Sequence, residues 1–153
     1  DAERASASVV SNPEGFKPSD APRIRWCWRA VKLPEGADGR LKDKDDQAVG
    51  LYIGSGGVFS KSSISYRWDS ETPVPSEGNC SYGGGSIKVR WFTLRNKSDK
   101  IGEWIVEERD WLSDYKNAYG ELPKDIYLSI CSNSQYTGTN AYAEIKWVEF
   151  LKK

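Results

Sequence analysis

Residues 126–150 decide the fold, and they read IYLSICS (126–132), NSQYTGTN (133–140) and AYAEIKWVEF (141–150). The first and third segments alternate apolar and polar side chains, which is the period of a β-strand with one buried face. The middle segment is polar and contains Gly138, which is typical of a loop. The stretch therefore predicts two strands joined by a loop.

The alternation in the last segment is interrupted near its end. Ala143, Ile145 and Trp147 fall on one face of the expected strand, whereas Val148 and Phe150 are apolar residues of the other face. A β-bulge near Trp147, or a strand end that is covered on both faces, would account for the change.

Five earlier segments alternate in the same way, at 23–33, 47–53, 62–69, 87–94 and 102–109. Residues 111–119 instead carry apolar side chains at helical spacing. Asp110 before them is a favourable N-cap, and Gly120 after them can end a helix in the left-handed conformation. Seven strands and one short helix near 110–119 predict an all-β fold, an antiparallel β-sandwich of the jelly-roll type.

The length of 153 residues fits one domain. Residues 1–22 are rich in Ser, Ala and Pro and show little periodicity, so we expect an N-terminal arm or linker there and a single β-sandwich domain over 23–153. The polar start without Met suggests a processed or trimmed product.

The composition excludes several classes of function. Lys plus Arg and Asp plus Glu number 22 each, so no overall charge favours nucleic acid. No segment approaches the roughly 20 apolar residues of a membrane span. The chain has no His, the commonest general base near neutral pH and the commonest metal ligand. Any chemistry would therefore rest on carboxylates, Lys, Tyr or Cys.

The three cysteines, Cys27, Cys80 and Cys131, lie far apart in the sequence. The absence of a Cys-x-x-Cys pair argues against a zinc site. In a secreted chain, one disulfide with one free thiol is the simple interpretation, and three pairings are open. Buried free thiols are the alternative.

Several motifs are spread along residues 24–150. They are Trp26-x-Trp28-Arg29, Leu33-Pro-Glu-Gly36, Asp45-Asp46, Gly102-Glu-Trp-x-x-Glu-Glu-Arg-Asp110, Asp114-Tyr115-x-x-x-Tyr119-Gly120 and Asn133-x-x-x-Thr137-Gly138. Together they resemble the bacterial proteins grouped as domain of unknown function 3047. The resemblance implies bacterial origin and export, to the periplasm, the cell surface or the medium. It implies no activity, because that family is uncharacterised.

This chain departs from the pattern of that family at three positions. Glu144 stands where Asp is common, and Ser134 and Gln135 stand where acidic residues are common. More distantly, the chain is similar to carbohydrate-binding jelly rolls, which often end in a Gly-containing loop followed by such a strand. That second likeness concerns the fold.

Aromatic residues make up 12% of the chain, and seven of them are Trp. Modules that bind polysaccharides stack sugar rings on exposed Trp and Tyr side chains. The proposed ligand-binding residues are Tyr66, Trp68, Tyr82, Trp91 and Trp104. Tyr82 belongs to the Pro- and Gly-rich stretch 70–85. The competing interpretation is a buried aromatic layer.

A structural calcium site is the second candidate. Jelly-roll modules commonly hold Ca²⁺ with carboxylates and backbone carbonyls. Asp45 and Asp46 precede an expected strand and Glu144 lies on the last one, so the three would converge if these strands were neighbours. A solvated acidic loop is the alternative.

Three functions follow from these observations. The first is non-catalytic polysaccharide binding by a secreted, monomeric β-sandwich through exposed aromatic residues. The second is a structural or protein-interaction domain with buried aromatics. The third is a small glycan-cleaving enzyme that uses Glu107, Glu108 and Asp110. Neighbouring residues of a strand point to opposite faces, so a salt-bridged surface strand is favoured over this pair of carboxylates.

Overall fold

The computed structural model describes residues 2–11, 13, 17–57 and 60–153. Its strands are β1 (Ala2–Glu3), β2 (Ser6–Ser11), β3 (Arg23–Lys32), β4 (Gln47–Gly56), β5 (Lys61–Trp68), β6 (Ser76–Tyr82), β7 (Ile87–Arg95), β8 (Ile105–Arg109), β9 (Tyr127–Asn133) and β10 (Asn140–Leu151). The helix α1 spans Trp111–Tyr119, and short 3₁₀ turns lie at Pro18–Asp20, Lys42–Lys44 and Gly83–Gly85.

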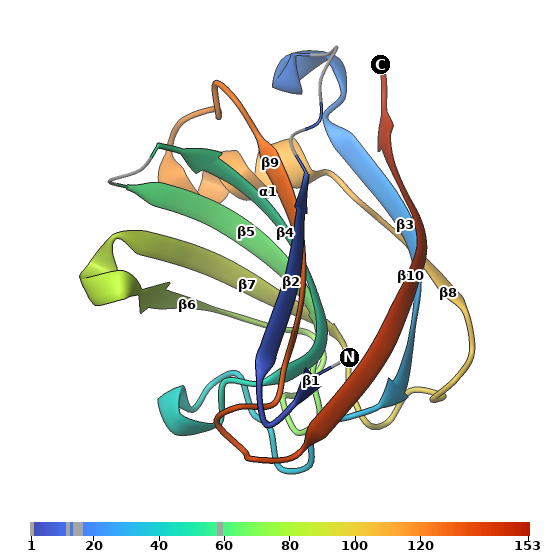
Figure 1. Cartoon of the computed structure of the whole chain (residues 1–153). Coiled ribbons are helices and arrows are strands. Elements are labelled where there is room, and N and C mark those ends of the chain that lie inside the picture. The colour runs from blue at the N-terminus through green and yellow to red at the C-terminus, as the bar shows by residue number, and fades with distance from the viewer. Residues whose placement is uncertain (1, 12, 14–16, 58–59) are drawn as a thin grey trace.

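The strands form two sheets that pack face to face (Figure 1). The four-stranded sheet has the order β1-β10-β3-β8, and the six-stranded sheet has the order β2-β9-β4-β5-β7-β6. Among the described strands, β5 and β7 form the one parallel pair. The predicted antiparallel β-sandwich is therefore confirmed, with β1, β2 and β6 as strands that the sequence did not predict.

Aromatic side chains fill the space between the sheets. The ring of Trp26 lies 5.2 Å from that of Tyr66 and 5.3 Å from that of Trp28, and Trp28 lies 5.7 Å from Trp68, as measured between centroids. All four side chains are fully buried. The proposal that Tyr66 and Trp68 contact a ligand is thus wrong. Both faces of β5 are buried, and alternation groups residues by face without telling which face meets water.

The helix prediction is confirmed in position and in its ends. The Asp110 side chain accepts a hydrogen bond of 2.9 Å from the Ser113 amide, and Gly120 adopts φ 77°. Trp111 and Tyr115 are the buried residues of α1. The Tyr115 hydroxyl contacts that of Ser62 on β5 at 2.6 Å, so the helix lies against the six-stranded sheet.

The ends of the chain also belong to the sandwich. β1 pairs with β10 and β2 pairs with β9, so the described part of the expected N-terminal arm runs as two edge strands. In β10 the register with β3 shifts between Ile145 and Trp147, which is the predicted irregularity near Trp147.

No helix of the described residues is long and apolar enough to cross a membrane.

The aromatic core predicts a large difference between two tryptophans. Trp28→Ala should lower the free energy of unfolding by about 3–5 kcal/mol, because it leaves a cavity between the sheets. Trp147→Ala, on the exposed side of β10, should cost about 1 kcal/mol or less. Urea titration followed by circular dichroism measures both, and equal losses would contradict the assignment of Trp28 to the core.

Candidate functional site

A cleft of about 400 Å³ crosses the face of the six-stranded sheet that lies away from the aromatic core. Every strand of this sheet contributes to it, as does the loop 134–139. Its lining residues are Ser6, Ser8, Gln47, Tyr52, Lys61, Ser63, Tyr82, Ile87, Val89, Tyr127, Ser129, Cys131, Asn133, Gln135 and Tyr136. Because the cleft draws on strands that are distant in the sequence, only the folded sheet assembles it.

Two glycines of β4 make room for the aromatic side chains of the cleft. A Cβ at Gly54 would lie 2.1 Å from Cζ of Tyr127, and a Cβ at Gly50 would lie 2.6 Å from Cε2 of Tyr52. The rings of Tyr52 and Tyr127 therefore lie flat against the backbone of β4, where another residue would displace them. The Tyr52 hydroxyl accepts a hydrogen bond of 3.1 Å from the Gln47 amide group.

The polar groups of the cleft are neutral apart from Lys61. Among the residues that the structure describes, none of the lining side chains is acidic. Burial raises the pKa of Tyr52 to about 12 and also raises the pKa of Tyr127. Both hydroxyls therefore stay protonated near neutral pH, and each can donate and accept a hydrogen bond.

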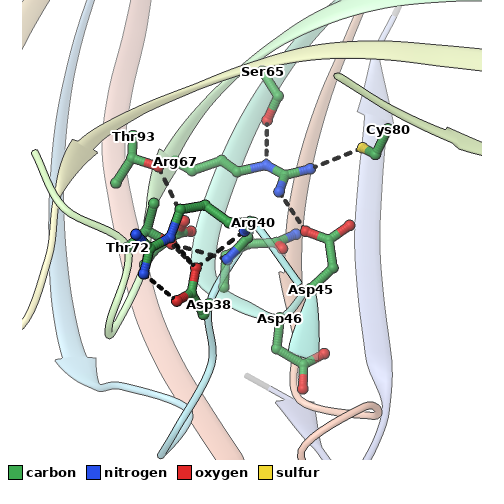
Figure 2. A network of polar contacts seen from close by, with 12 residues as sticks. Asp38, Arg40, Asp45, Asp46, Ser65, Arg67, Thr72, Cys80 and Thr93 are labelled. Atoms are coloured by element: carbon green, nitrogen blue, oxygen red, sulfur yellow. Dashed lines mark hydrogen bonds and ion pairs between the residues drawn. The ribbon is translucent and has the colours of Figure 1, made fainter. Parts of the chain in front are cut away.

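Figure 2 shows the polar contacts of a buried arginine, Arg67 on β5, which neighbours the cleft residue Tyr82 through Asp45. Arg67 has no exposed surface, and its Nη1 donates to Oδ1 of Asp45 at 2.6 Å. Its remaining nitrogens point at Ser65 Oγ (3.4 Å) and Cys80 Sγ (3.5 Å). Burial alone would lower the pKa of Arg67, but neighbouring acidic groups, including Asp45, raise it overall. The guanidinium is therefore a permanent positive charge buried on the cleft side of the sheet.

The ion pair also positions one wall of the cleft. The second oxygen of Asp45 accepts a hydrogen bond of 2.6 Å from the Tyr82 hydroxyl. The ring of Trp91 lies 5.6 Å from Cζ of Arg67 and covers Gly78 of β6. Trp91 is thus buried, and its proposed contact with ligand is wrong, because it packs on Arg67 from the cleft side of β7.

A second buried carboxylate holds the loop at the other end of the cleft. Asp46 accepts hydrogen bonds from the Thr137 amide (2.7 Å), the Thr137 hydroxyl (2.8 Å) and the Tyr136 amide (3.3 Å). These bonds fix residues 134–139 against the start of β4 and leave Tyr136 at the rim, 43% exposed.

Of the five aromatic residues proposed as ligand contacts, Tyr82 lines the cleft. Trp104 is 41% exposed, but it lies beside the four-stranded sheet, with the Arg29 guanidinium 4.6 Å from its ring. The sequence analysis missed Tyr52, Tyr127 and Tyr136. A signal for Tyr127 was present, because it alternates with Ser129 and Cys131 on the polar face of its strand.

The three carboxylates proposed for calcium do not converge. Asp45 bonds to Arg67 and Tyr82, and Asp46 bonds to the 134–139 loop. Glu144 instead pairs with Arg29 and accepts a hydrogen bond from the Tyr142 hydroxyl on the four-stranded sheet. Within residues 2–11, 13, 17–57 and 60–153, no three His, Cys, Asp or Glu side chains gather as a metal site. Calcium binding stays a prediction without a defined set of ligands.

Two of the three candidate catalytic carboxylates form ion pairs, and the third, Asp110, caps α1. Glu107 binds Arg95 at 2.6 Å and Glu108 pairs with Arg23, as the salt-bridged interpretation expected. Arg109 pairs with Asp114 rather than with either glutamate. The cysteines are free thiols on three different strands, so the alternative of unpaired thiols describes the structure.

Comparison with protein families gives a match over residues 1–149 to the family described as "Protein of unknown function (DUF3047)". The match covers nearly the whole chain, so the chain belongs to this family, and the resemblance seen in the sequence is confirmed.

The chain is also similar to a curated protein named GMP reductase from Chromobacterium violaceum, with 25% identity over 144 residues. The alignment covers 94% of this chain and 44% of that protein, so the chain spans less than half the length of this relative. Among solved structures, it is similar to a meso-active thermo-stable cellulase derived from the Cel12A cellulase of Rhodothermus marinus. The TM-score is 0.51 at 12% identity, over 93% of this chain and 72% of the cellulase chain. At this identity the likeness shows a shared fold.

The Asp46 contacts predict a loosened loop in the Asp46→Ala variant. Its Tyr136 and Thr137 amides should exchange with deuterium at least tenfold faster than in the wild type, because their acceptor is gone. Ser98 is the internal control, since its amide bonds to Asn96 far from the cleft and should keep its rate. Unchanged exchange in the 134–139 loop would contradict the role of Asp46.

The buried Asp69 predicts a pH-dependent stability. One of its oxygens accepts from Thr93 at 3.0 Å, the other has no hydrogen-bond partner among the described residues, and burial raises its pKa from 3.8 to about 6. The folded protein therefore binds more protons than the unfolded chain between these values, and stability should fall as pH rises from 4 to 6. The difference corresponds to roughly 3 kcal/mol.

Asp69→Asn should remove this contribution to the slope of stability against pH. Urea unfolding of both proteins at several pH values from 4 to 7 measures it. Identical slopes would contradict the raised pKa of Asp69.

Proposed function

We propose that this member of the DUF3047 family binds a polysaccharide, without cleaving it, in the cleft that crosses its six-stranded sheet. One observation carries the proposal. The cleft is lined by residues of all six strands and of the loop 134–139, it combines tyrosine rings with amide and hydroxyl groups, and none of its described lining side chains is acidic. The family resemblance supports a bacterial protein that meets its polysaccharide outside the cytoplasm.

The chemistry of the lining suits sugar rings. The C–H face of a pyranose packs on an aromatic face, and the tyrosines Tyr52, Tyr82, Tyr127 and Tyr136 supply such faces. The exposed amide of Gln135 and the exposed hydroxyls of Ser6 and Ser8 present donors and acceptors for the hydroxyl groups of a sugar. The protonated tyrosine hydroxyls add groups that both donate and accept.

The shape of the cleft suits a stretch of polymer rather than a single sugar. Neighbouring strands lie about 4.8 Å apart, so a groove across six strands is about 24 Å long. Lining residues come from the edge strand β6 at one side, Tyr82, and from the edge strand β2 at the other, Ser6 and Ser8. A linear glycan lying across the strands would contact the tyrosines in succession.

The same lining argues against glycan cleavage in this cleft. Glycosidases generally use two carboxyl groups about 5–10 Å apart at the scissile bond. Asp45 and Asp46, which contact the lining residues Tyr82 and Tyr136, are both buried, and Asp45 is also bound by Arg67. The likeness to the cellulase concerns the fold alone.

Substitution at the rim tests the proposal. Tyr136→Ala should weaken polysaccharide binding by about tenfold, or 1.4 kcal/mol, because it removes a stacking face. Affinity electrophoresis in gels that contain hydroxyethylcellulose, xylan, galactomannan or pullulan measures the retardation. Tyr142→Ala is the matched control, since Tyr142 is 40% exposed on the other sheet, against 43% for Tyr136.

Retardation of the wild type in at least one gel, reduced by Tyr136→Ala and kept by Tyr142→Ala, would support the cleft. A wild type that none of these polysaccharides retards, or equal losses in the two variants, would contradict it.

A further inference from the structure

The strand β2 is an edge that lacks the usual protection against further pairing. It hydrogen-bonds with β9 and with no other strand in the described part of the chain. Its sequence SASVVS has no charged residue and no proline, and all six residues are exposed. Val9 and Val10 are 71% and 61% exposed. Unpaired backbone groups beside exposed valines are a template for another strand.

The other edges of the two sheets are protected. β8 carries Glu107, Glu108 and Arg109, and β1 is two residues long. β6 carries Glu77, which pairs with Arg90. Charge and short length are the devices by which natural sheets prevent edge-to-edge association. Their absence from β2 singles out this edge of the sandwich.

An apolar crevice accompanies the unprotected edge. It measures about 160 Å³ and is lined by residues of β2, β4, β9 and β10. Ala7, Val9, Val49, Ile130, Ala143 and Ile145 contribute to its walls. Strand addition uses backbone hydrogen bonds for affinity and pockets for alternate side chains, and this edge offers both.

We propose that a second copy of the protein adds its own β2 to this edge, antiparallel, to form a two-fold symmetric dimer. A two-fold contact places the same surface of each copy against the other. This surface must therefore be complementary to an identical copy of itself. β2 fulfils this condition because it brings no charge near the other copy. By contrast, β8 would bring glutamates together. Each copy would also place its apolar residues next to the crevice of the other.

The dimer would change how the cleft works, a point that rests on the proposed function. The cleft reaches β2 through Ser6 and Ser8, so pairing of two β2 strands would align two clefts along one continuous sheet. A polymer that occupies one cleft would then hold the second at high effective concentration, which raises the overall affinity without new contacts.

Analytical ultracentrifugation of the whole chain over a wide range of concentrations tests the dimer. The wild type should show a reversible monomer–dimer equilibrium. Val9→Lys and Val9→Glu should each raise the dimer dissociation constant at least tenfold, and an equimolar mixture of the two should restore the dimer by pairing opposite charges. Val106→Lys is the matched control, since Val106 is 55% exposed on the protected edge β8.

Circular dichroism checks that each variant is folded, and the restored mixture excludes misfolding as the cause of the loss. A wild type that stays monomeric at every concentration, Val9 variants that dimerise like the wild type, or an equal effect of Val106→Lys would overturn the proposal. Affinity electrophoresis separates the two proposals. If the wild type is monomeric in the ultracentrifuge but a polysaccharide retards it, the dimer proposal fails and the binding proposal stands. If the wild type forms the dimer but no polysaccharide retards it, the binding proposal fails and the dimer proposal stands.

Discussion

The ion pair between Arg67 and Asp45 is the constraint on which the cleft depends. A charge in the interior is tolerated only where partners replace the lost water, and here Ser65, Cys80 and the ring of Trp91 complete the surroundings of the guanidinium. The pair ties the segment before β4 to β5, and through Asp45 it reaches Tyr82 on β6. Loss of either partner would leave an unpaired buried charge on the cleft side of the sheet. The wall of the cleft that contains Tyr82 would then no longer be held in place.

The six-stranded sheet serves two purposes because its strands alternate. On β5, Tyr66 and Trp68 enter the aromatic core, whereas Ser63 and Arg67, at alternate positions of the strand, face the cleft side. Both faces are buried in the middle of this strand, one by the other sheet and one by neighbouring side chains. The aromatic core therefore fixes the sheet from behind, and the cleft is built on a surface that cannot shift independently of it.

The fold was predictable from the sequence, and the site largely was not. Alternation over 126–150 and a helical period closed by Asp110 and Gly120 are local signals, so they identified β9, β10 and α1, whereas β1, β2 and β6 were not predicted. Which face of a strand is buried depends on the strands that pack against it, and the sequence of a single segment does not contain this information. For that reason Tyr66, a core residue, was predicted to contact a ligand. The contact between Asp45 and Arg67 joins residues 22 apart in the sequence, and its formation needs the loop before β4 to fold back.

The likeness to a cellulase concerns the fold, so the proposed function depends on the side chains near the groove, above all on the carboxylates. Cleavage needs carboxyl groups that face the glycosidic bond with an oxygen free to move a proton. In this chain one oxygen of Asp45 accepts from Arg67 and the other from Tyr82, and Asp46 is occupied by the backbone and hydroxyl of the 134–139 loop. Both carboxylates are thus engaged in bonds that hold the walls of the cleft in place. The described lining of the groove is therefore mainly tyrosine, amide and hydroxyl, together with Lys61 and the aliphatic Ile87 and Val89, and the proposed binding function rests on this surface.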